Sequence, residues 1–276
     1  MLIDLIYAVI LGVIEGITEW LPISSTAHII IIEKMFYSSN YKPSFSEEFL
    51  LLFDVLIQLG AIIAVIIIYF KRLYPFKYNN EQYKSKDKLT IWFKVLFSCL
   101  PIIIVALLFD DVITKYLYNL TTISIVLILY GVIFIFIENS SKKYKITDIK
   151  QMSYKKSIVI GFIQVLALIP GTSRSGVTII GGNILDCDRK TSMEYSFFLS
   201  IPIMLGASIY KLGKYLIYYK INLNEIIILL IAMLVAMLTS LIVIKKLLDY
   251  IKNNSFKVFG IYRIVLGIII LIISLF

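Results

Sequence analysis

Long apolar runs are the feature that most constrains the fold of this 276-residue chain. Six segments reach or approach the roughly 20 apolar residues that an α-helix needs to cross the hydrocarbon core of a bilayer. Charged residues make up only 16% of the sequence and gather between these runs. The sequence therefore predicts an all-α, polytopic integral membrane protein. The expected spanning segments are residues 49–70, 91–109, 121–137, 194–213, 225–244 and 256–276.

The overall composition also indicates a membrane protein. Apolar residues make up 59% of the chain and the mean hydropathy is +0.90, whereas soluble domains contain roughly 45–50% apolar residues. The 27 Lys and Arg residues outnumber the 18 Asp and Glu residues, which gives a net charge of +9. In a soluble chain this excess would favour nucleic acid as a partner. Here the basic residues lie in loops, as the positive-inside rule requires, so we expect no nucleic-acid partner.

Two apolar segments that end in proline are similar to one another. Gly-Val-Ile-Glu-Gly-Ile-Thr-Glu-Trp-Leu-Pro ends at Pro22, and Gly-Phe-Ile-Gln-Val-Leu-Ala-Leu-Ile-Pro ends at Pro170. Interruptions at corresponding places in two halves are typical of inverted-repeat membrane proteins, whose site lies where the repeats meet. With one gap, the alignment pairs Pro22 with Pro170, Ser24 with Thr172, Ser25 with Ser173 and Thr26 with Arg174.

The predicted architecture has two inverted-topology repeats, residues 1–138 and 155–276, within one membrane domain. Each repeat contributes three of the six spanning helices and one re-entrant helical hairpin. The first hairpin is expected around residues 12–33 and the second around residues 157–184.

Lysine-rich loops indicate how these elements cross the membrane. Many of the lysines fall in loops 71–94 and 139–157, and the positive-inside rule places such loops on the cytoplasmic side. Both loops can lie there only if each hairpin returns to the side from which it entered. The first hairpin then enters from outside, the second enters from the cytoplasm, and both termini lie outside.

Two carboxylates precede the first interruption. Glu15 and Glu19 are four residues apart and therefore lie on one face of a helix. A carboxylate at the centre of a bilayer costs at least about 2.5–3.5 kcal/mol, and such residues are usually functional. Glu19 alone could instead reach water from an interfacial position. A divalent cation, Mg²⁺ or Ca²⁺, or a shared proton would relieve the repulsion between the pair, and we favour the cation.

Hydroxyl residues follow the proline at both interruptions. Such residues often do no more than cap the free N–H groups at the start of a helix. Inside a membrane cavity, however, the same N-terminus attracts phosphate through its N–H groups and the helix dipole. Three hydroxyls in each half exceed what a cap requires. The candidate phosphate-binding hydroxyl residues are Ser24, Ser25 and Thr26 in the first half and Thr172, Ser173 and Ser175 in the second.

His28 is the only histidine in the chain. On a helix it could reach the hydroxyl of Ser24 or Ser25, which is the spacing of a nucleophile and its base. A lone histidine at a helix start is otherwise often bonded only to its neighbours. Because two glutamates and three hydroxyls lie within fourteen residues, we favour a catalytic role.

Arg174 lies between two apolar stretches and needs an anionic partner there. Its planar guanidinium suits phosphate oxygens, and Gly171 and Gly176 would let backbone N–H groups approach a ligand. The alternative is a structural ion pair with Glu15 or Glu19 across the repeat interface. Gly-x-x-x-Gly at residues 12–16, in contrast, predicts close helix packing.

The motifs at residues 15–28 and 170–176 resemble the undecaprenyl-diphosphatase, or bacitracin-resistance, family, and the similarity extends over essentially the whole chain. Ala27 departs from the glycine usual in that family. The resemblance implies removal of the terminal phosphate from undecaprenyl diphosphate, which recycles the lipid carrier for cell-wall synthesis and confers bacitracin resistance. By motif position, the functional residues of the family fall on Glu15, Glu19, Ser25, His28, Ser173 and Arg174.

These expectations combine into one hypothesis, with alternatives. A multi-pass protein of the bacterial cytoplasmic (inner) membrane would open its active site to the outer face and take a polyprenyl diphosphate lipid. Ser25 would attack with His28 as base, or water would attack with His28 or Glu19 as base. The rival function is a transporter or flippase of an anionic lipid. Assembly into a homodimer is left open.

Overall fold

The computed structural model describes residues 2–38, 43–76, 85–139 and 144–275. Parts of both lysine-rich loops and the predicted last residue of the final span, Phe276, lie outside these ranges. Apart from one isolated bridge between Ile146 and Cys187, the described residues form helices and the loops between them. The helices are α1 (Leu2–Thr18), α2 (Ser25–Ser38), α3 (Glu47–Ile68), α4 (Phe70–Leu73), α5 (Ser85–Leu117), α6 (Leu120–Asn139), η1 (Ile149–Gln151), α7 (Tyr154–Gln164), η2 (Val165–Leu168), α8 (Arg174–Ile184), α9 (Arg189–Tyr218), α10 (Leu223–Asn253) and α11 (Lys257–Leu275).

Six described helices are long and apolar enough to cross a membrane, and they correspond to the six predicted spans. They are α3, α5, α6, α9, α10 and α11. The all-α, multi-pass class is therefore confirmed. Several helices extend well beyond the predicted ranges, because their polar ends continue the helix after the apolar run has stopped. Pro101 and Pro202 lie inside α5 and α9 without ending them, as proline often does in membrane helices.

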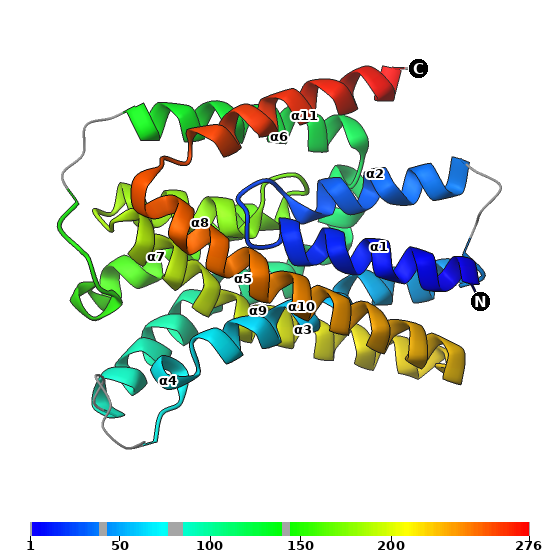
Figure 1. Cartoon of the computed structure of the whole chain (residues 1–276), viewed down its shortest axis with the longest axis horizontal. Helices are drawn as coiled ribbons and strands as arrows, with labels where there is room; N and C mark the ends of the chain where they lie inside the picture. The colour runs from blue at the N-terminus through cyan, green and yellow to red at the C-terminus, as the bar shows by residue number, and fades with distance from the viewer. Residues whose placement is uncertain (1, 39–42, 77–84, 140–143, 276) are drawn as a thin grey trace.

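The remaining long helices form two hairpins. The first hairpin consists of α1 and α2, joined by a turn at residues 19–24, and the second consists of α7, η2 and α8, with a turn at residues 169–173. In Figure 1 the open end of the first hairpin points to the right and that of the second to the left, so their turns approach one another in the middle of the molecule. This is the arrangement expected of two hairpins that enter from opposite sides.

The first helix of each hairpin packs mainly against the half of the chain to which it does not belong, whereas α8 packs against α9 of its own half. Helix α1 packs against α10, and α7 packs against α5, while α3 pairs with α9 and α6 with α11 (Figure 1). A two-fold axis relating the halves would produce this exchange. The repeat boundaries themselves stay a prediction.

Close helix packing explains the spaced glycines of α1. A Cβ on Gly12 would lie 2.6 Å from the carbonyl oxygen of Ala232, and a Cβ on Gly16 would lie 2.6 Å from that of Ala236. The predicted packing role of this Gly-x-x-x-Gly motif is confirmed, and α10 is its partner. This contact holds the end of α1, and with it Glu15 and Glu19, at a defined depth.

Candidate active site

Both hairpin turns end in a serine with unusual backbone geometry. Ser24 immediately precedes α2 and has φ 76°, and Ser173 immediately precedes α8 and has φ 70°. Non-glycine residues rarely occupy this left-handed region. The structure therefore makes Ser24 equivalent to Ser173, which corrects the predicted pairing of Ser25 with Ser173 by one residue. The reason is an additional residue in the second turn, where Gly171 adopts φ 89°.

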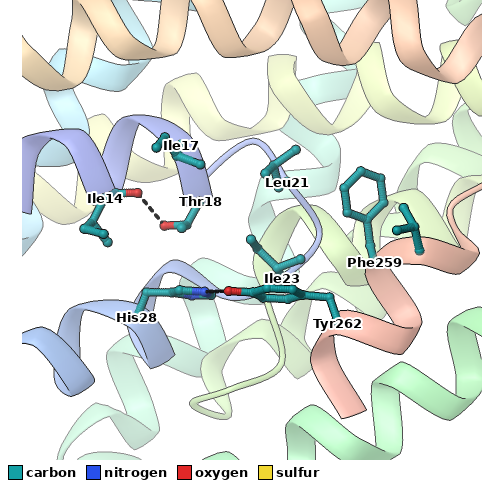
Figure 2. Close-up of a pocket in the computed structure, with 9 residues that line it drawn as sticks. Ile14, Ile17, Thr18, Leu21, Ile23, His28, Phe259 and Tyr262 are labelled. Carbon is teal, nitrogen blue, oxygen red and sulfur yellow. Dashed lines mark hydrogen bonds between the residues drawn. The ribbon is translucent and has the colours of Figure 1, made fainter. Parts of the chain in front are cut away.

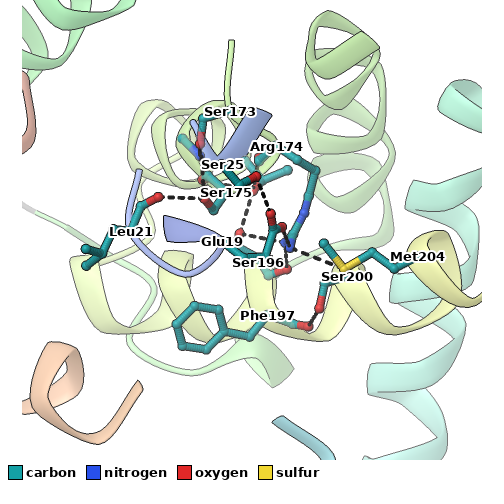
Figure 3. Close-up of polar contacts among 12 residues, drawn as sticks. Glu19, Leu21, Ser25, Ser173, Arg174, Ser175, Ser196, Phe197, Ser200 and Met204 are labelled. Atoms are coloured by element: carbon teal, nitrogen blue, oxygen red, sulfur yellow. Dashed lines mark hydrogen bonds and ion pairs between the residues drawn. The ribbon is translucent and has the colours of Figure 1, made fainter. Parts of the chain in front are cut away.

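The second turn presents the start of α8 to the first turn. The Ser173 hydroxyl caps α8 by accepting a 3.1 Å hydrogen bond from the Gly176 N–H. Ser173 Oγ lies 3.1 Å from Ser175 Oγ, and Ser175 Oγ donates to the Leu21 carbonyl at 3.3 Å. The Ser173 hydroxyl thus serves as the cap of α8, while the Ser175 hydroxyl connects the two turns (Figure 3).

A single carboxylate joins the two hairpins at their turns. Glu19 Oε1 accepts a 2.7 Å hydrogen bond from Arg174, and Glu19 Oε2 accepts one of 2.7 Å from Ser25 Oγ (Figure 3). Glu19 and Arg174 also form an ion pair and are nearly buried. Ser25 and Arg174 are the first residues of α2 and α8. The structure therefore brings an arginine, a carboxylate and a hydroxyl together at two helix N-termini.

Neighbouring groups hold the Arg174 guanidinium in place. One amino group donates to the Ser196 carbonyl at 2.7 Å, and the other approaches the sulfur of Met204 at 4.0 Å. Thr178 Oγ1 donates to the Arg174 carbonyl and lies 2.7 Å from Ser196 Oγ. The Nε of Arg174 is buried and has no hydrogen-bond partner in the described part of the chain. A buried donor left free in this way is suited to an anionic ligand.

Glu15 lies one turn before Glu19, and neither of its carboxylate oxygens has a hydrogen-bond partner among the residues that the structure describes. It is fully buried and interacts electrostatically with Glu19, Asp54 and Arg174. Gln164, at the corresponding position of the second hairpin, is likewise fully buried with an unpartnered amide. Such groups are costly unless water, a proton or a ligand completes them.

His28 faces away from Ser25. Its Nδ1 lies 2.7 Å from the Ser24 carbonyl oxygen and its Nε2 lies 2.7 Å from Tyr262 Oη. A carbonyl only accepts, so Nδ1 carries the proton and Nε2 accepts from the tyrosine hydroxyl. Within the described part of the chain, no hydrogen bond joins His28 to Ser25, and the nucleophile–base contact predicted for this pair is not formed.

An apolar cavity of about 380 Å³ lies beside these residues, between the first hairpin and α11. His28 and Tyr262 form one wall, where their nearly parallel rings lie end to end and hydrogen bond (Figure 2). Thr18 is at the opposite side and carries one of the few polar groups of the lining. The cavity therefore offers an apolar surface next to the polar turns. The remaining lining residues are Ile14, Ile17, Leu21, Ile23, Val258 and Phe259.

The other predicted hydroxyls occupy different places. Thr172 is fully buried, and its hydroxyl has no hydrogen-bond partner. Thr26 lies on the first turn of α2 and contacts the Tyr118 hydroxyl. Ser24 is buried at the strained end of the first turn. Like Thr26, Thr172 lies next to a tyrosine hydroxyl, that of Tyr130.

Comparisons with known proteins show the family of the chain. The family model for bacitracin resistance protein BacA matches residues 8–269. The chain belongs to the BacA family. An undecaprenyl-diphosphatase of Acetivibrio thermocellus is 46% identical over 273 residues, covering 98% of each chain. An undecaprenyl-diphosphatase of Enterococcus faecalis is 48% identical over 267 residues, covering 96% of this chain and 95% of the relative.

Three residues that contact the site of this BacA-family chain were not predicted. Ser196 supports Arg174 from α9, Tyr262 binds His28, and Arg263 contacts both turns. Arg263 carries the only visible signal, a charge within an apolar run. Neither Ser196 nor Tyr262 is marked by a motif, because each contacts the site from another part of the chain.

Proposed function

We propose that this chain hydrolyses undecaprenyl diphosphate to undecaprenyl phosphate and inorganic phosphate. The observation that carries the proposal is the contact of Glu19 with both Ser25 and Arg174 at the N-termini of two half-helices. The relatives named undecaprenyl-diphosphatase cover nearly the whole chain, and the family name implies bacitracin resistance. Phosphoryl transfer needs mainly positioning and positive charge, and this arrangement supplies both.

The contacts favour Ser25 as nucleophile. Its Oγ would attack the terminal phosphorus, and Glu19, which already accepts the Ser25 hydrogen bond, would take the proton. The bond from phosphorus to the bridging oxygen then breaks, and undecaprenyl phosphate leaves with the proton that Glu19 had taken. Water would next attack the Ser25–phosphate ester and give its proton to Glu19, which would return it to the departing Ser25 oxygen as inorganic phosphate is released.

Glu19 is better placed than His28 for the proton transfer. The Nε2 of His28 is engaged by the hydroxyl of Tyr262 and its Nδ1 by a backbone carbonyl. His28 would therefore serve to hold the first turn of α2 against α11. A base must lie within hydrogen-bond reach of the proton that it removes, and Glu19 meets this condition.

Arg174 and the helix N-termini would bind the phosphates. The guanidinium has a free Nε donor, and its ion pair with Glu19 would open in part as a phosphate replaces the carboxylate. The buried hydroxyl of Thr172, next to that of Tyr130, would add a further polar group. Ser173, Ser175, Ser24 and Thr26 would shape the turns whose N–H groups face the ligand.

The residues present fit a divalent cation. Both oxygens of Glu15 are buried and unpartnered one helical turn from Glu19, and Mg²⁺ is commonly bound by one or two carboxylates together with substrate phosphates. Within the described ranges no group of three or more Asp, Glu, His or Cys residues has the spacing of a metal site. Glu15 and Glu19 would hold Mg²⁺ or Ca²⁺, which would supply positive charge to the diphosphate.

The apolar cavity indicates where the lipid would lie. Its wall includes Thr18 at the end of α1 and Leu21 of the first turn, so an isoprenoid chain in the cavity would leave its headgroup near Arg174. We place the protein in the bacterial cytoplasmic membrane with this site open to the outer face. The residues named for this site all come from one chain.

Phosphate release from undecaprenyl diphosphate by purified protein in detergent tests the proposal. We expect turnover without any membrane gradient, whereas a pure carrier would release no phosphate. Arg174→Ala should abolish turnover, while Arg189→Gln, which disrupts an ion pair with Glu138 away from the turns, should retain it. Near-normal turnover by Arg174→Ala would refute the proposed site, and no turnover by the wild type would favour the carrier.

A further inference from the structure

One buried arginine of α11 contacts both hairpin turns. An amino group of Arg263 donates to the Pro22 carbonyl of the first turn at 3.2 Å. The other amino group donates to two carbonyls of the second turn, Gly171 at 2.7 Å and Thr172 at 3.0 Å. Arg263 is 0% exposed. It is therefore a crosslink between the turns that carry the phosphate site.

The partners of Arg263 are all neutral. Its contacts are three backbone carbonyls and the ring of Tyr130, whose centroid lies 5.6 Å from the guanidinium carbon. Within the described part of the chain it forms no ion pair with a carboxylate. A buried guanidinium without a counter-charge is costly, so simple stabilisation of the fold is a poor reason to keep an arginine here.

The three carbonyl groups that Arg263 binds explain why an arginine suits this position. They belong to turns between helices, where backbone oxygens lack helical partners and must be satisfied inside the membrane. A guanidinium offers several donors in a fixed plane, whereas an ammonium is a point charge. Arginine can therefore hold both turns at a set separation and angle.

Arg263 also lies directly behind the start of α8. A Cβ on Gly176 would be 3.4 Å from an Arg263 amino nitrogen and 3.3 Å from Ser173 Oγ. Arg174 begins this helix and reaches Glu19 of the opposite turn. A shift of the second turn would thus move the Arg174 guanidinium relative to Glu19 and Ser25.

We infer that Arg263 is a positioning residue, which holds the two hairpin turns together so that Arg174 on one meets Glu19 and Ser25 on the other. The inference rests on the proposed function for its catalytic consequence. We assign Arg263 a positioning role because it is fully buried and both of its amino groups are occupied by the turns, although its Nε has no hydrogen-bond partner among the described residues.

Two variants and two measurements test this role. In Arg263→Gln, kcat should fall about 100-fold, as expected when reacting groups shift by about 1 Å. Amide hydrogen exchange should rise in the peptides covering both turns, residues 19–24 and 169–173, since their common restraint is lost. Arg263→Lys keeps the charge but not the planar fork, and both quantities should lie between those of the wild type and Arg263→Gln.

Arg72→Lys is the matched control, because Arg72 is a second buried arginine, with its ion pairs to Glu194 and Asp148. It should leave the exchange of both turns and the kcat close to wild type. Unchanged exchange of the turns in Arg263→Gln, or a uniform rise along the whole chain, would overturn the inference. Because exchange needs no substrate, an inactive wild type would refute only the proposed function.

Discussion

Ser25 Oγ donates a 2.7 Å hydrogen bond to Glu19 Oε2, and the other oxygen of the same carboxylate accepts from Arg174. One side chain thus links the candidate nucleophile to the candidate phosphate-binding arginine. It is also the anion that Arg174 binds when no phosphate is present. Substrate would compete with Glu19 for the guanidinium and leave the carboxylate facing the Ser25 proton.

Loss of the Ser25 hydroxyl should abolish turnover if Ser25 is the nucleophile. We expect Ser25→Ala to reduce kcat at least about 10³-fold, because no covalent intermediate can form. The wild type, quenched with acid during turnover, should carry phosphate on the peptide that contains Ser25, as measured by mass spectrometry. Near-normal turnover by Ser25→Ala would show instead that water attacks directly.

The rank order of two substitutions should identify the base. Glu19→Gln removes the group that accepts the Ser25 proton, and we expect kcat to fall by about 10²–10⁴-fold. His28→Gln should reduce kcat less, because His28 is bonded to Tyr262 and not to Ser25. Tyr262→Phe removes that bond and should resemble His28→Gln. A larger loss in His28→Gln than in Glu19→Gln would restore histidine as the base.

Much of the membrane architecture follows from the sequence because it depends on local composition. An apolar run of about 20 residues has few alternatives to a spanning helix, and the six predicted spans correspond to helices of the structure. The ends of the helices were missed, since a helix such as α5 continues into polar residues at both ends. Composition predicts where the apolar part of a helix begins and ends, but it does not predict the full length of the helix.

The sequence predicts those contacts of the site that pair charged residues within apolar segments, because such charges need partners. Arg174 meets Glu19, one of its two predicted ion-pair partners. The direction of the His28 ring was not predictable, because Tyr262, 234 positions later, determines it. The register of the second turn was also missed, because similar hydroxyl residues align in either register and only the backbone at Ser24 and Ser173 distinguishes them.

Gly171 should tolerate no side chain. Its φ of 89° is strained for other residues, and a Cβ would lie 2.8 Å from the Ile123 carbonyl oxygen. We expect Gly171→Ala to destabilise the protein by about 1–3 kcal/mol and to reduce turnover by displacing the second turn. Gly206→Ala is the matched control, since a Cβ there meets nothing within 4 Å. Thermal unfolding in detergent measures both, and equal midpoints for the two variants would contradict the argument.

The repulsion between Glu15 and Glu19 can be relieved by a bound divalent cation or by a shared proton, and a chelator distinguishes the two. If Glu15 and Glu19 hold a divalent cation, a chelator should abolish turnover, and added Mg²⁺ or Ca²⁺ should restore it. Glu15→Gln removes one anionic ligand, so the cation concentration for half-maximal activity should rise at least about tenfold. Asp249→Asn, at an exposed carboxylate paired with Lys252, should leave this concentration unchanged. If the two carboxylates instead share a proton, the chelator should not change turnover. Glu15→Gln should then not alter the response of turnover to added cation, because no cation is bound at this pair.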